Sequence, residues 1–295
     1  MTSSNPVSKR VGFVNKGNTC YANSILQALS VLPYVSAQAS SEGDLLCPLV
    51  QSLSSNMSLL KRATSAIDPS NFLRALQNLM RESSPSFDFN KPQDACEVLV
   101  QVLAELSGSS HALFNVFSME IRSTTTCELC DCSEIEEECL NVFDLPVKPK
   151  LSSALSERLK SANVVKGCAN CNAQTSFVRD YKILSSGSVV IFSIERFSHQ
   201  NGQIIRNPST IDCLEDITVP VSPSLDDSLV VSFRNKYSLV ATINHSGTLS
   251  NGHYTAFIKD PLSHRWLHCN DMCVSFCEAD KLVNATSYVL FYLRK

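Results

Sequence analysis

Hydrophobic positions in the first 110 residues recur with the spacing of amphipathic helices. Three segments show it most clearly, 21–32, 69–81 and 93–106, each with apolar residues three or four positions apart. This spacing places the apolar side chains on one face of a helix, which can then pack on a core. The pattern therefore predicts a mainly helical N-terminal part.

After about residue 112 the pattern changes to short apolar or alternating runs, which are typical of β-strands. The predicted strands are 117–122, 189–194, 229–233, 237–243, 253–259 and 288–293. Turn pairs such as Asn201-Gly202 and Asn251-Gly252 separate some of them, and a short helix is predicted at 151–160. Helices followed by strands indicate an α+β fold, in which a helical part facing a sheet leaves a cleft between the two.

The composition is that of a folded protein with nearly balanced charge. Of the 295 residues, 44% are hydrophobic and 18% are charged, which excludes a disordered chain. The net charge of −3 excludes nucleic-acid binding through a bulk positive field, so we expect no nucleic-acid partner. The longest apolar run, 189–192, is too short to cross a bilayer, so we expect no membrane association.

The thirteen cysteines point to a reducing compartment. An odd number cannot pair completely within one chain, and the first residues lack the apolar segment of a secretory signal. We therefore expect a cytoplasmic protein, a nuclear protein or both. In that setting cysteines are reduced, bind a metal or take part in catalysis.

Cys20 is the candidate nucleophile. The residues Gly17-Asn18-Thr19 form a turn into the first predicted helix, which places Cys20 in its first turn. The unpaired N–H groups and the dipole at a helix N-terminus favour an anion there. The position therefore predicts a lowered thiol pKa and a larger fraction of thiolate. The alternative is a buried structural cysteine.

His253 is the candidate partner of this thiol. It follows Gly252 at the start of a predicted strand, and Asn270 and Asp271 supply an amide and a carboxylate further on. The order Cys, His and then Asn or Asp is that of cysteine proteases. In such a site the thiolate attacks a carbonyl, the imidazole accepts and returns a proton, and the third residue orients the imidazole.

Two Cys-x-x-Cys pairs form a candidate metal site. They are Cys127 with Cys130 and Cys168 with Cys171. Each pair can supply two thiolates to a tetrahedral Zn²⁺ ion, and four thiolates close a structural site. We predict one structural zinc ion bound by these four residues. Two further cysteines, Cys132 and Cys139, lie close enough in sequence to complicate the choice of ligands.

Three longer segments resemble motifs of the ubiquitin-specific proteases, which are papain-like cysteine deubiquitinases. They are 12–21 around Cys20, 237–254 with His253, and 266–271, and they occur in the family's order. The resemblance extends over about 11–294, nearly the whole chain.

The resemblance implies a papain-like cysteine protease fold in a single catalytic domain, 1–295. It places a helical thumb at 11–112, zinc-bearing β fingers mainly at 113–187, and a β-sheet palm mainly at 188–295 with some finger strands. The substrate tail of such an enzyme threads between thumb and palm, and its two glycines suit a narrow channel.

The resemblance also implies catalytic roles for five residues. Cys20 matches the nucleophile and His253 the base. Asn270 matches the residue that orients the histidine, and Asp271 matches a neighbouring acid that can assist or replace it. Asn15 matches the side chain that donates to the oxyanion together with the backbone N–H of Cys20.

Residues 92–99 resemble a family helix whose acids contact arginines near the ubiquitin C-terminus. Asp94 and Glu97 carry over and are predicted to share one helical face. We also assign Gly252 and Tyr254, on either side of the histidine, to substrate binding. The segment departs from the family pattern at Pro92, Cys96 and Val98, so we expect an altered contact with the substrate.

The sequence thus predicts a thiol-dependent deubiquitinase that cleaves after the C-terminal Gly-Gly of ubiquitin. Its partners would be ubiquitin and ubiquitin conjugates. One alternative is a protease for another ubiquitin-like modifier, which the altered 92–99 segment favours. A second is a weakly active ubiquitin-binding scaffold, against which the complete set of catalytic residues argues.

Overall fold

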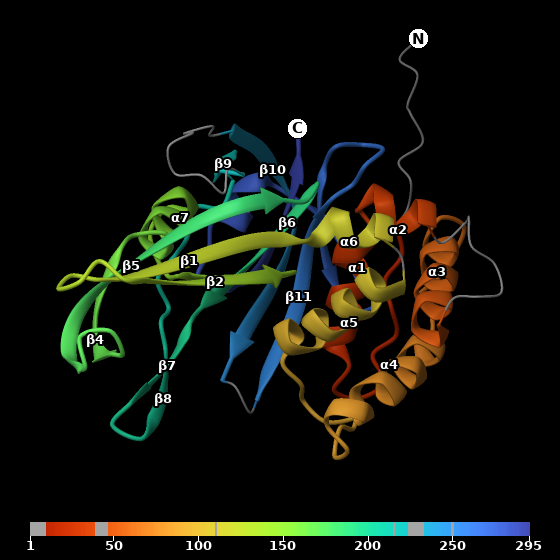
Figure 1. Ribbon diagram of the computed structural model, residues 1–295. Coiled ribbons are helices and arrows are strands. Elements are labelled where there is room, and N and C mark those ends of the chain that lie inside the picture. The colour runs from red at the N-terminus through yellow and green to blue at the C-terminus, as the bar shows by residue number, and fades with distance from the viewer. Residues whose placement is uncertain (1–9, 39–46, 110, 215, 224–232, 249–250) are drawn as a thin grey trace, which may run out of the picture.

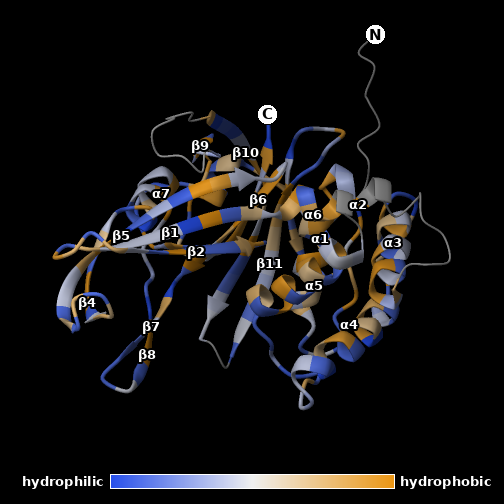
Figure 2. Ribbon diagram, viewed as in Figure 1, coloured by the Kyte–Doolittle hydropathy of each residue, from blue (hydrophilic) through white to orange (hydrophobic). Residues whose placement is uncertain are grey.

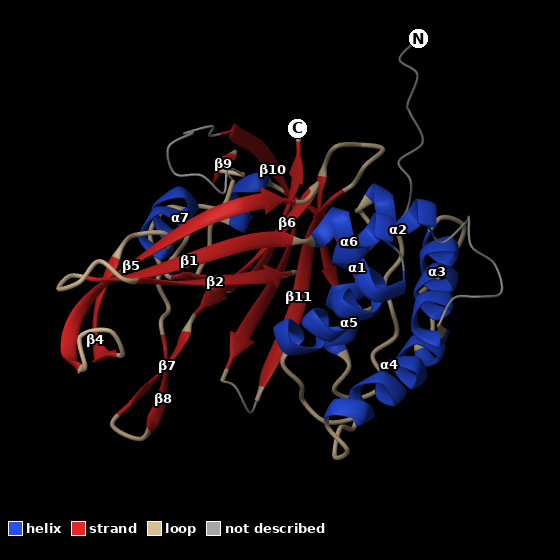
Figure 3. Ribbon diagram, viewed as in Figure 1, coloured by secondary structure: helices blue, strands red, loops and turns tan. Residues whose placement is uncertain are grey.

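The computed structural model describes residues 10–38, 47–109, 111–214, 216–223, 233–248 and 251–295. Figure 1 shows the helices of the N-terminal part on one side of a large sheet, while a narrower sheet extends away on the other side. We refer to these three parts as the thumb, the palm and the fingers. The same division is visible in the separation of helix and strand in Figure 3.

Within the described residues the thumb has six helices. They are α1 (Cys20–Leu29), α2 (Pro33–Gln38), α3 (Pro48–Leu60), α4 (Ser70–Ser83), α5 (Ala95–Ser109) and α6 (His111–Phe117). The predicted segments 21–32, 69–81 and 93–106 correspond to α1, α4 and α5. The sequence pattern missed α3 because polar Ser52 and Asn56 lie on its buried side. Each side chain donates within the helix, Ser52 Oγ to the Leu49 carbonyl and Asn56 Nδ2 to the Ser52 carbonyl, both at 2.8 Å.

The first finger strand starts later than predicted. Phe117 is the last residue of α6, and the N–H of Ser118 donates to the Phe114 carbonyl at 3.0 Å, which closes the final helical turn. The strand β1 then begins at Met119. A helical hydrogen bond thus overrides the alternating pattern at 117–118.

The fingers are a four-stranded antiparallel sheet. Its strands are β1 (Met119–Cys127), β2 (Ser133–Leu140), β4 (Ala162–Cys168) and β5 (Ala173–Ser186), in the order β2-β1-β5-β4. β1 and β4 both end on a cysteine, so the two predicted cysteine pairs meet at the tip of the sheet. A separate hairpin, β7 (Phe197–Gln200) and β8 (Gln203–Arg206), is joined by the predicted Asn201-Gly202 turn.

The palm is an eight-stranded sheet among the described residues. Its strands are β3 (Phe143–Pro146), β6 (Val189–Glu195), β9 (Ile217–Val221), β10 (Phe233–Gly247), β11 (Gly252–Lys259), β12 (Trp266–Asn270), β13 (Cys273–Cys277) and β14 (Ser287–Arg294). The order is β13-β12-β11-β10-β14-β6-β3, with β9 paired to the first part of β10. The strand predicted at 229–233 lies outside the described residues except for Phe233.

The palm carries a hydrophobic core on each face. Along β6, Val189 and Ile191 pack with the thumb, while Val190 and Phe192 pack on the opposite face with α7 (Leu151–Arg158). Burial on both faces explains why this strand reads as an unbroken apolar run. Figure 2 shows the corresponding hydrophobic residues along α5 and β6. Part of 113–187, namely β3 and α7, thus lies with the palm rather than with the fingers.

A buried arginine ties the end of β6 to its surroundings. Arg196 is 1% exposed, and it donates from Nε to the Ser287 carbonyl at 2.6 Å and from Nη1 to the Asn207 and Ser209 carbonyls. Arg196 therefore holds the segment after β8 against the start of β14.

No helix among the described residues has the length and apolarity needed to span a membrane.

Candidate functional site

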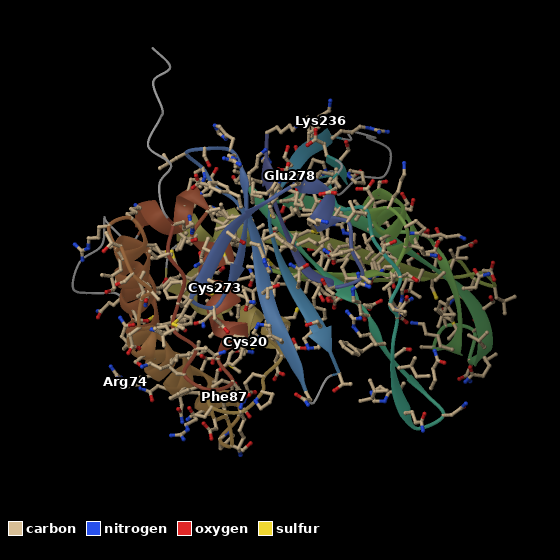
Figure 4. The ribbon with its side chains drawn as sticks, turned by 180° about the vertical axis from the view of Figure 1, so that it is seen from behind. Cys20, Arg74, Phe87, Lys236, Cys273 and Glu278 are labelled. Carbon is tan, nitrogen blue, oxygen red and sulfur yellow. The ribbon has the colours of Figure 1, made fainter. Side chains whose placement is uncertain are left out.

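Cys20 lies where the first thumb helix meets the palm. It is the first residue of α1, which packs against β11, and only 7% of it is exposed. The backbone N–H groups of Tyr254, Tyr21 and Cys20 itself lie close enough to the sulfur to lower its pKa, an effect smaller than that of its burial. The Tyr254 contact places the thiol beside the start of β11, next to His253. Figure 4 labels Cys20 in a view from behind the palm.

His253 and Asn270 form a direct pair. His253 is the second residue of β11, Asn270 is the last residue of the neighbouring β12, and His253 Nε2 lies 2.8 Å from Asn270 Oδ1. Because Oδ1 can only accept a hydrogen bond, Nε2 carries the proton. The neutral imidazole therefore has its lone pair on Nδ1, which is the nitrogen available to take a proton from a thiol.

Asp271 points away from this pair. Its Oδ2 accepts from Asn15 Nδ2 and its Oδ1 accepts from Asn23 Nδ2, both at 2.8 Å. The carboxylate thus joins the segment before α1 to the first turns of α1. Asn270 and Asp271, which are adjacent in sequence, serve opposite sides of the site: the amide contacts the histidine, and the acid contacts the two asparagines.

The backbone of the Asp271 turn is also held against the N-terminal segment. Asp271 has a positive φ of 48°, and its carbonyl accepts from the Phe13 N–H at 2.9 Å. A Cβ at Gly12 would lie 2.0 Å from the Asp271 carbonyl oxygen, so only glycine fits there. Asn15 Oδ1 accepts from the N–H groups of Gly17 and Thr19 at 3.0 and 3.3 Å, which fixes the other end of its amide.

Asp94 caps a helix instead of lying within it. The prediction that Asp94 and Glu97 share a helical face is wrong, because α5 begins at Ala95. Asp94 Oδ1 accepts from the N–H groups of Cys96 and Glu97 at 2.7 and 3.1 Å, as an N-cap does. Its Oδ2 accepts from the Tyr288 hydroxyl at 2.6 Å. Glu97 is exposed.

Gly252 and Tyr254 lie at the junction of thumb and palm. The buried Tyr254 hydroxyl accepts from the Ala95 N–H at 3.4 Å, and its ring centroid is 4.6 Å from that of His245. A Cβ at Gly252 would lie 2.1 Å from His245 Nε2, so this position also requires glycine. β11 therefore connects the thumb cap at Asp94 with the His253 pair.

Five cysteine sulfurs gather at the tip of the fingers. Those of Cys127, Cys130, Cys132 and Cys168 all lie within 4.8 Å of one another. Cys130 is 3.7 Å from Cys168, and Cys127 is 3.8 Å from Cys171. Zinc–sulfur bonds of about 2.3 Å in a tetrahedron require sulfurs about 3.8 Å apart. The cluster therefore has the donors and the spacing to hold a metal ion.

Cys132, one of the two further cysteines noted from the sequence, lies within this cluster. Its sulfur lies 3.3 Å from that of Cys130 and 3.5 Å from that of Cys168, closer than two ligands of one zinc ion stand. Cys139, the other nearby cysteine, is exposed and faces Glu120 at the far end of β2 from the tip. Only Cys132 therefore competes with the four predicted ligands.

Residues 11–292 match a family model described as ubiquitin carboxyl-terminal hydrolase. The chain belongs to this family. Among its relatives, mouse ubiquitin carboxyl-terminal hydrolase 51 is 27% identical over 338 residues, covering 96% of this chain and 51% of the mouse protein. Human ubiquitin carboxyl-terminal hydrolase 27 is 24% identical over 361 residues, covering 99% of this chain and 80% of the human protein. The chain thus spans about half to four-fifths of these relatives.

Solved structures share the fold of this ubiquitin carboxyl-terminal hydrolase family member. The SAGA Ubp8/Sgf11/Sus1/Sgf73 DUB module bound to ubiquitin aldehyde contains a chain that matches with a TM-score of 0.79 and 21% identity, covering 100% of the present chain and 72% of that chain. The corresponding module with a substituted Ubp8, bound to monoubiquitin, matches with a TM-score of 0.77 and 21% identity, covering 97% and 69%. The predicted thumb, fingers and palm fold is confirmed.

The prediction of a lowered pKa for Cys20 is wrong for this hydrolase family member. Burial of the thiol raises its pKa, and the three backbone N–H groups offset only part of that effect. The Asp271 carboxylate adds a smaller effect in the same direction. Desolvation disfavours a thiolate more than one helix N-terminus favours it, because the side chain is almost fully removed from water.

We therefore expect alkylation of Cys20 by iodoacetamide to accelerate with rising pH, with a midpoint above the value of about 8.5 for a free cysteine. A raised pKa means that the reactive thiolate forms only at higher pH. Asp271→Asn should move the midpoint down, because it removes a negative charge near the sulfur. Mass spectrometry of the Cys20 peptide would follow the reaction in the ubiquitin-free chain. A midpoint at or below about pH 8.5 would contradict the expectation.

Three residues of the site escaped sequence reasoning. Asn23 holds Asp271, Tyr288 holds Asp94, and His245 packs against Tyr254 and Gly252. Asn23 lies three positions after Cys20, on the same side of a helix, which was the one signal available. The other two belong to strands whose polar residues look ordinary without knowledge of the strand order.

Proposed function

We propose that the chain is a thiol-dependent protease that hydrolyses the bond after the C-terminal glycine of ubiquitin. The observation that carries this proposal is the arrangement at the start of β11. His253 Nε2 is held by Asn270 at 2.8 Å, and the Cys20 sulfur lies beside the next backbone N–H. The relatives' names and the ubiquitin-bound structures of similar fold support ubiquitin as the substrate.

The geometry suits acyl transfer. Cys20 Sγ gives up its proton to His253 Nδ1 and attacks the carbonyl carbon of the last glycine. The tetrahedral intermediate collapses as the C–N bond breaks, and His253 returns the proton to the leaving amine. Water, deprotonated by the same imidazole, then hydrolyses the thioester. Asn270 keeps the imidazole in the required tautomer throughout.

Asn15 is placed to stabilise the oxyanion. One N–H of its amide is bound to Asp271, and its carbonyl is bound to two backbone N–H groups. The second amide hydrogen is then available, together with the backbone N–H of Cys20, for the oxygen of the tetrahedral intermediate. Asp271 and Asn23 act as positioning residues, since they set the orientation of this donor without touching the reacting atoms.

Hydrolysis of ubiquitin carrying a small fluorogenic amide at its C-terminus tests the proposal. We expect release of the fluorophore, and much slower release from a ubiquitin-like modifier that carries the same group. Faster cleavage of the other modifier would favour the first alternative function. Tight binding of ubiquitin without any turnover would favour the second, a ubiquitin-binding scaffold.

We further propose that the fingers hold one structural zinc ion through Cys127, Cys130, Cys168 and Cys171. The sulfur–sulfur separations of 3.7 and 3.8 Å within this set suit a tetrahedral zinc site. The sulfur of Cys132 lies too close to those of Cys130 and Cys168 to be a ligand of the same ion. When bound, the ion would join the ends of β1 and β4. It would stabilise the tip and take no part in the reaction.

Cys168→Ser and Cys171→Ser should each abolish zinc binding, measured by elemental analysis as a fall from one ion per chain. Loss of the ion should lower the unfolding temperature by about 5–10 °C, because metal binding contributes to folding. Cys132→Ser should retain the ion, as should the matched control Cys139→Ser on the body of β2. Loss of zinc in Cys132→Ser and its retention in Cys171→Ser would reverse the assignment.

A further inference from the structure

A cavity of about 460 Å³ opens beside the catalytic histidine, on the face of the palm that points away from the thumb. Its walls come from β10, β11, β12 and β13 and from the 3₁₀ helix η1 (Ala279–Leu282) that follows them. Residues that line it include His253, Thr255, Phe257, His268, Ser275 and Lys281. In Figure 4, Cys273 marks the start of β13 and Glu278 follows its end. The volume is within the usual range for ligand sites.

The alternation of β11 separates this cavity from the thumb side of the site. Tyr254, Ala256 and Ile258 belong to the core that β11 shares with the thumb, whereas Thr255 and Phe257 line the cavity. Of the residues assigned to the ubiquitin tail, Tyr254 accepts from the Ala95 N–H at the start of α5, and Asp94 accepts from the Tyr288 hydroxyl on β14. The two faces of β11 can therefore serve the two sides of the scissile bond.

His253 forms the boundary between the two faces. Its Nε2 is occupied by Asn270, so Nδ1 is the atom that returns a proton to the leaving amine. That amine must therefore lie within hydrogen-bond distance of the imidazole at the moment of cleavage. The imidazole is part of the cavity wall, so a polypeptide attached to that amine has this cavity next to it.

The lining suits a lysine side chain and the backbone around it. The Phe257 and His268 rings lie with their centroids 4.8 Å apart and their planes tilted by 32°, and they offer an apolar surface for the methylene groups of lysine. Thr255 and Ser275 offer hydroxyl groups to a peptide backbone. Burial, and to a smaller extent the neighbouring His253, lowers the pKa of His268.

The cavity lining carries little charge. Lys281 lines it, whereas Glu278 and Asp280 do not and lie near Cys277, where they add to the effect of burial in raising its thiol pKa. A lining of this kind selects by hydrogen bonding and shape more than by net charge. A polypeptide backbone meets this requirement better than a strongly charged small ligand.

We propose that this cavity is the leaving-group subsite: it binds the lysine side chain and adjacent backbone of the polypeptide that is released. The proposal rests on the proposed ubiquitin hydrolase function. In the step concerned, the bond between the glycine carbonyl carbon and the lysine Nε breaks, the Cys20 thioester forms, and the His253 proton goes to Nε. The polypeptide then leaves with a neutral amine.

Filling the cavity tests the proposal. Ser275→Trp places a large side chain in the cavity from the exposed edge strand β13. Ser275→Arg fills the same space with a flexible, charged side chain. Thr218→Trp is the matched control, since Thr218 is an exposed strand residue on β9 outside the cavity. Two substrates are compared: ubiquitin joined to the lysine Nε of a short fluorescent peptide, and ubiquitin with a small fluorogenic amide.

We expect both Ser275 variants to lower kcat/KM for the isopeptide substrate by about tenfold and to leave the small amide nearly unaffected. The control should change neither. Equal losses on both substrates would overturn the proposal, because the cavity would then act through His253 and not through the leaving group. Unchanged cleavage of both would overturn it as well. Failure of the unmodified chain to cleave either substrate would overturn the proposed function itself.

Discussion

Cys20→Ala should reduce hydrolysis of a ubiquitin C-terminal amide by at least about 10⁴-fold. Cys20 is the residue whose sulfur lies beside the start of β11, so the alanine variant lacks the atom that forms the thioester. Binding of ubiquitin should persist, because the contacts of the thumb and palm are unchanged. Fluorophore release and titration calorimetry with ubiquitin measure the two properties separately.

Cys139→Ala is the matched control for this variant. Cys139 is an exposed cysteine on β2 of the fingers, where it pairs with Glu120. Its replacement should leave hydrolysis within about twofold of the unmodified chain, since surface substitutions away from a site change little. Hydrolysis by Cys20→Ala at more than about one per cent of the normal rate would contradict the nucleophile assignment.

Asn15→Ala and Asp271→Ala should each lower kcat by about 100- to 1,000-fold with little change in KM. Asn15 donates to charge that develops only in the transition state, and Asp271 holds the Asn15 amide at 2.8 Å. Because the two residues act as one unit, the double variant should be no slower than the slower single variant. Steady-state kinetics on the fluorogenic amide, measured for the unmodified chain, the two single variants and the double variant, test this prediction.

Asp271→Asn distinguishes positioning from a merely structural role. Its remaining oxygen can accept from one of the two asparagines, so we expect partial recovery of kcat relative to Asp271→Ala. Asn270→Ala provides the contrast. Asn270 contacts His253 directly, so this variant should change the pH dependence of kcat. Multiplicative losses in the Asn15 and Asp271 double variant would show that the acid acts elsewhere, for example on the histidine.

Local patterns predicted the parts of this protein that short stretches of chain decide. The helices α1, α4 and α5 follow from apolar spacing, and β6 follows from an unbroken apolar run that is buried on both faces. The predicted Asn201-Gly202 turn joins β7 and β8. These features depend on neighbours within a few positions, so tertiary contacts reinforce them rather than override them.

Predictions failed where contacts from distant segments decide the outcome. The strand expected to begin at Phe117 starts at Met119, since α6 keeps its last turn. Asp94 precedes α5 and caps it, while its other oxygen is bound by Tyr288 from the opposite end of the chain.

The sequence by itself determined the order of the motifs, the candidate nucleophile and base, the α+β class and the two Cys-x-x-Cys pairs. Residue type and local spacing encode these features directly. Only the tertiary structure decided that Asn270 contacts His253, whereas Asp271 contacts Asn15 and Asn23. The two contacts of Asp271 each join residues more than 240 positions apart in the sequence. It also decided that burial raises the pKa of Cys20 and that a cavity adjoins His253. Desolvation, strand order and the direction of a side chain arise from packing between distant segments, which no local pattern records.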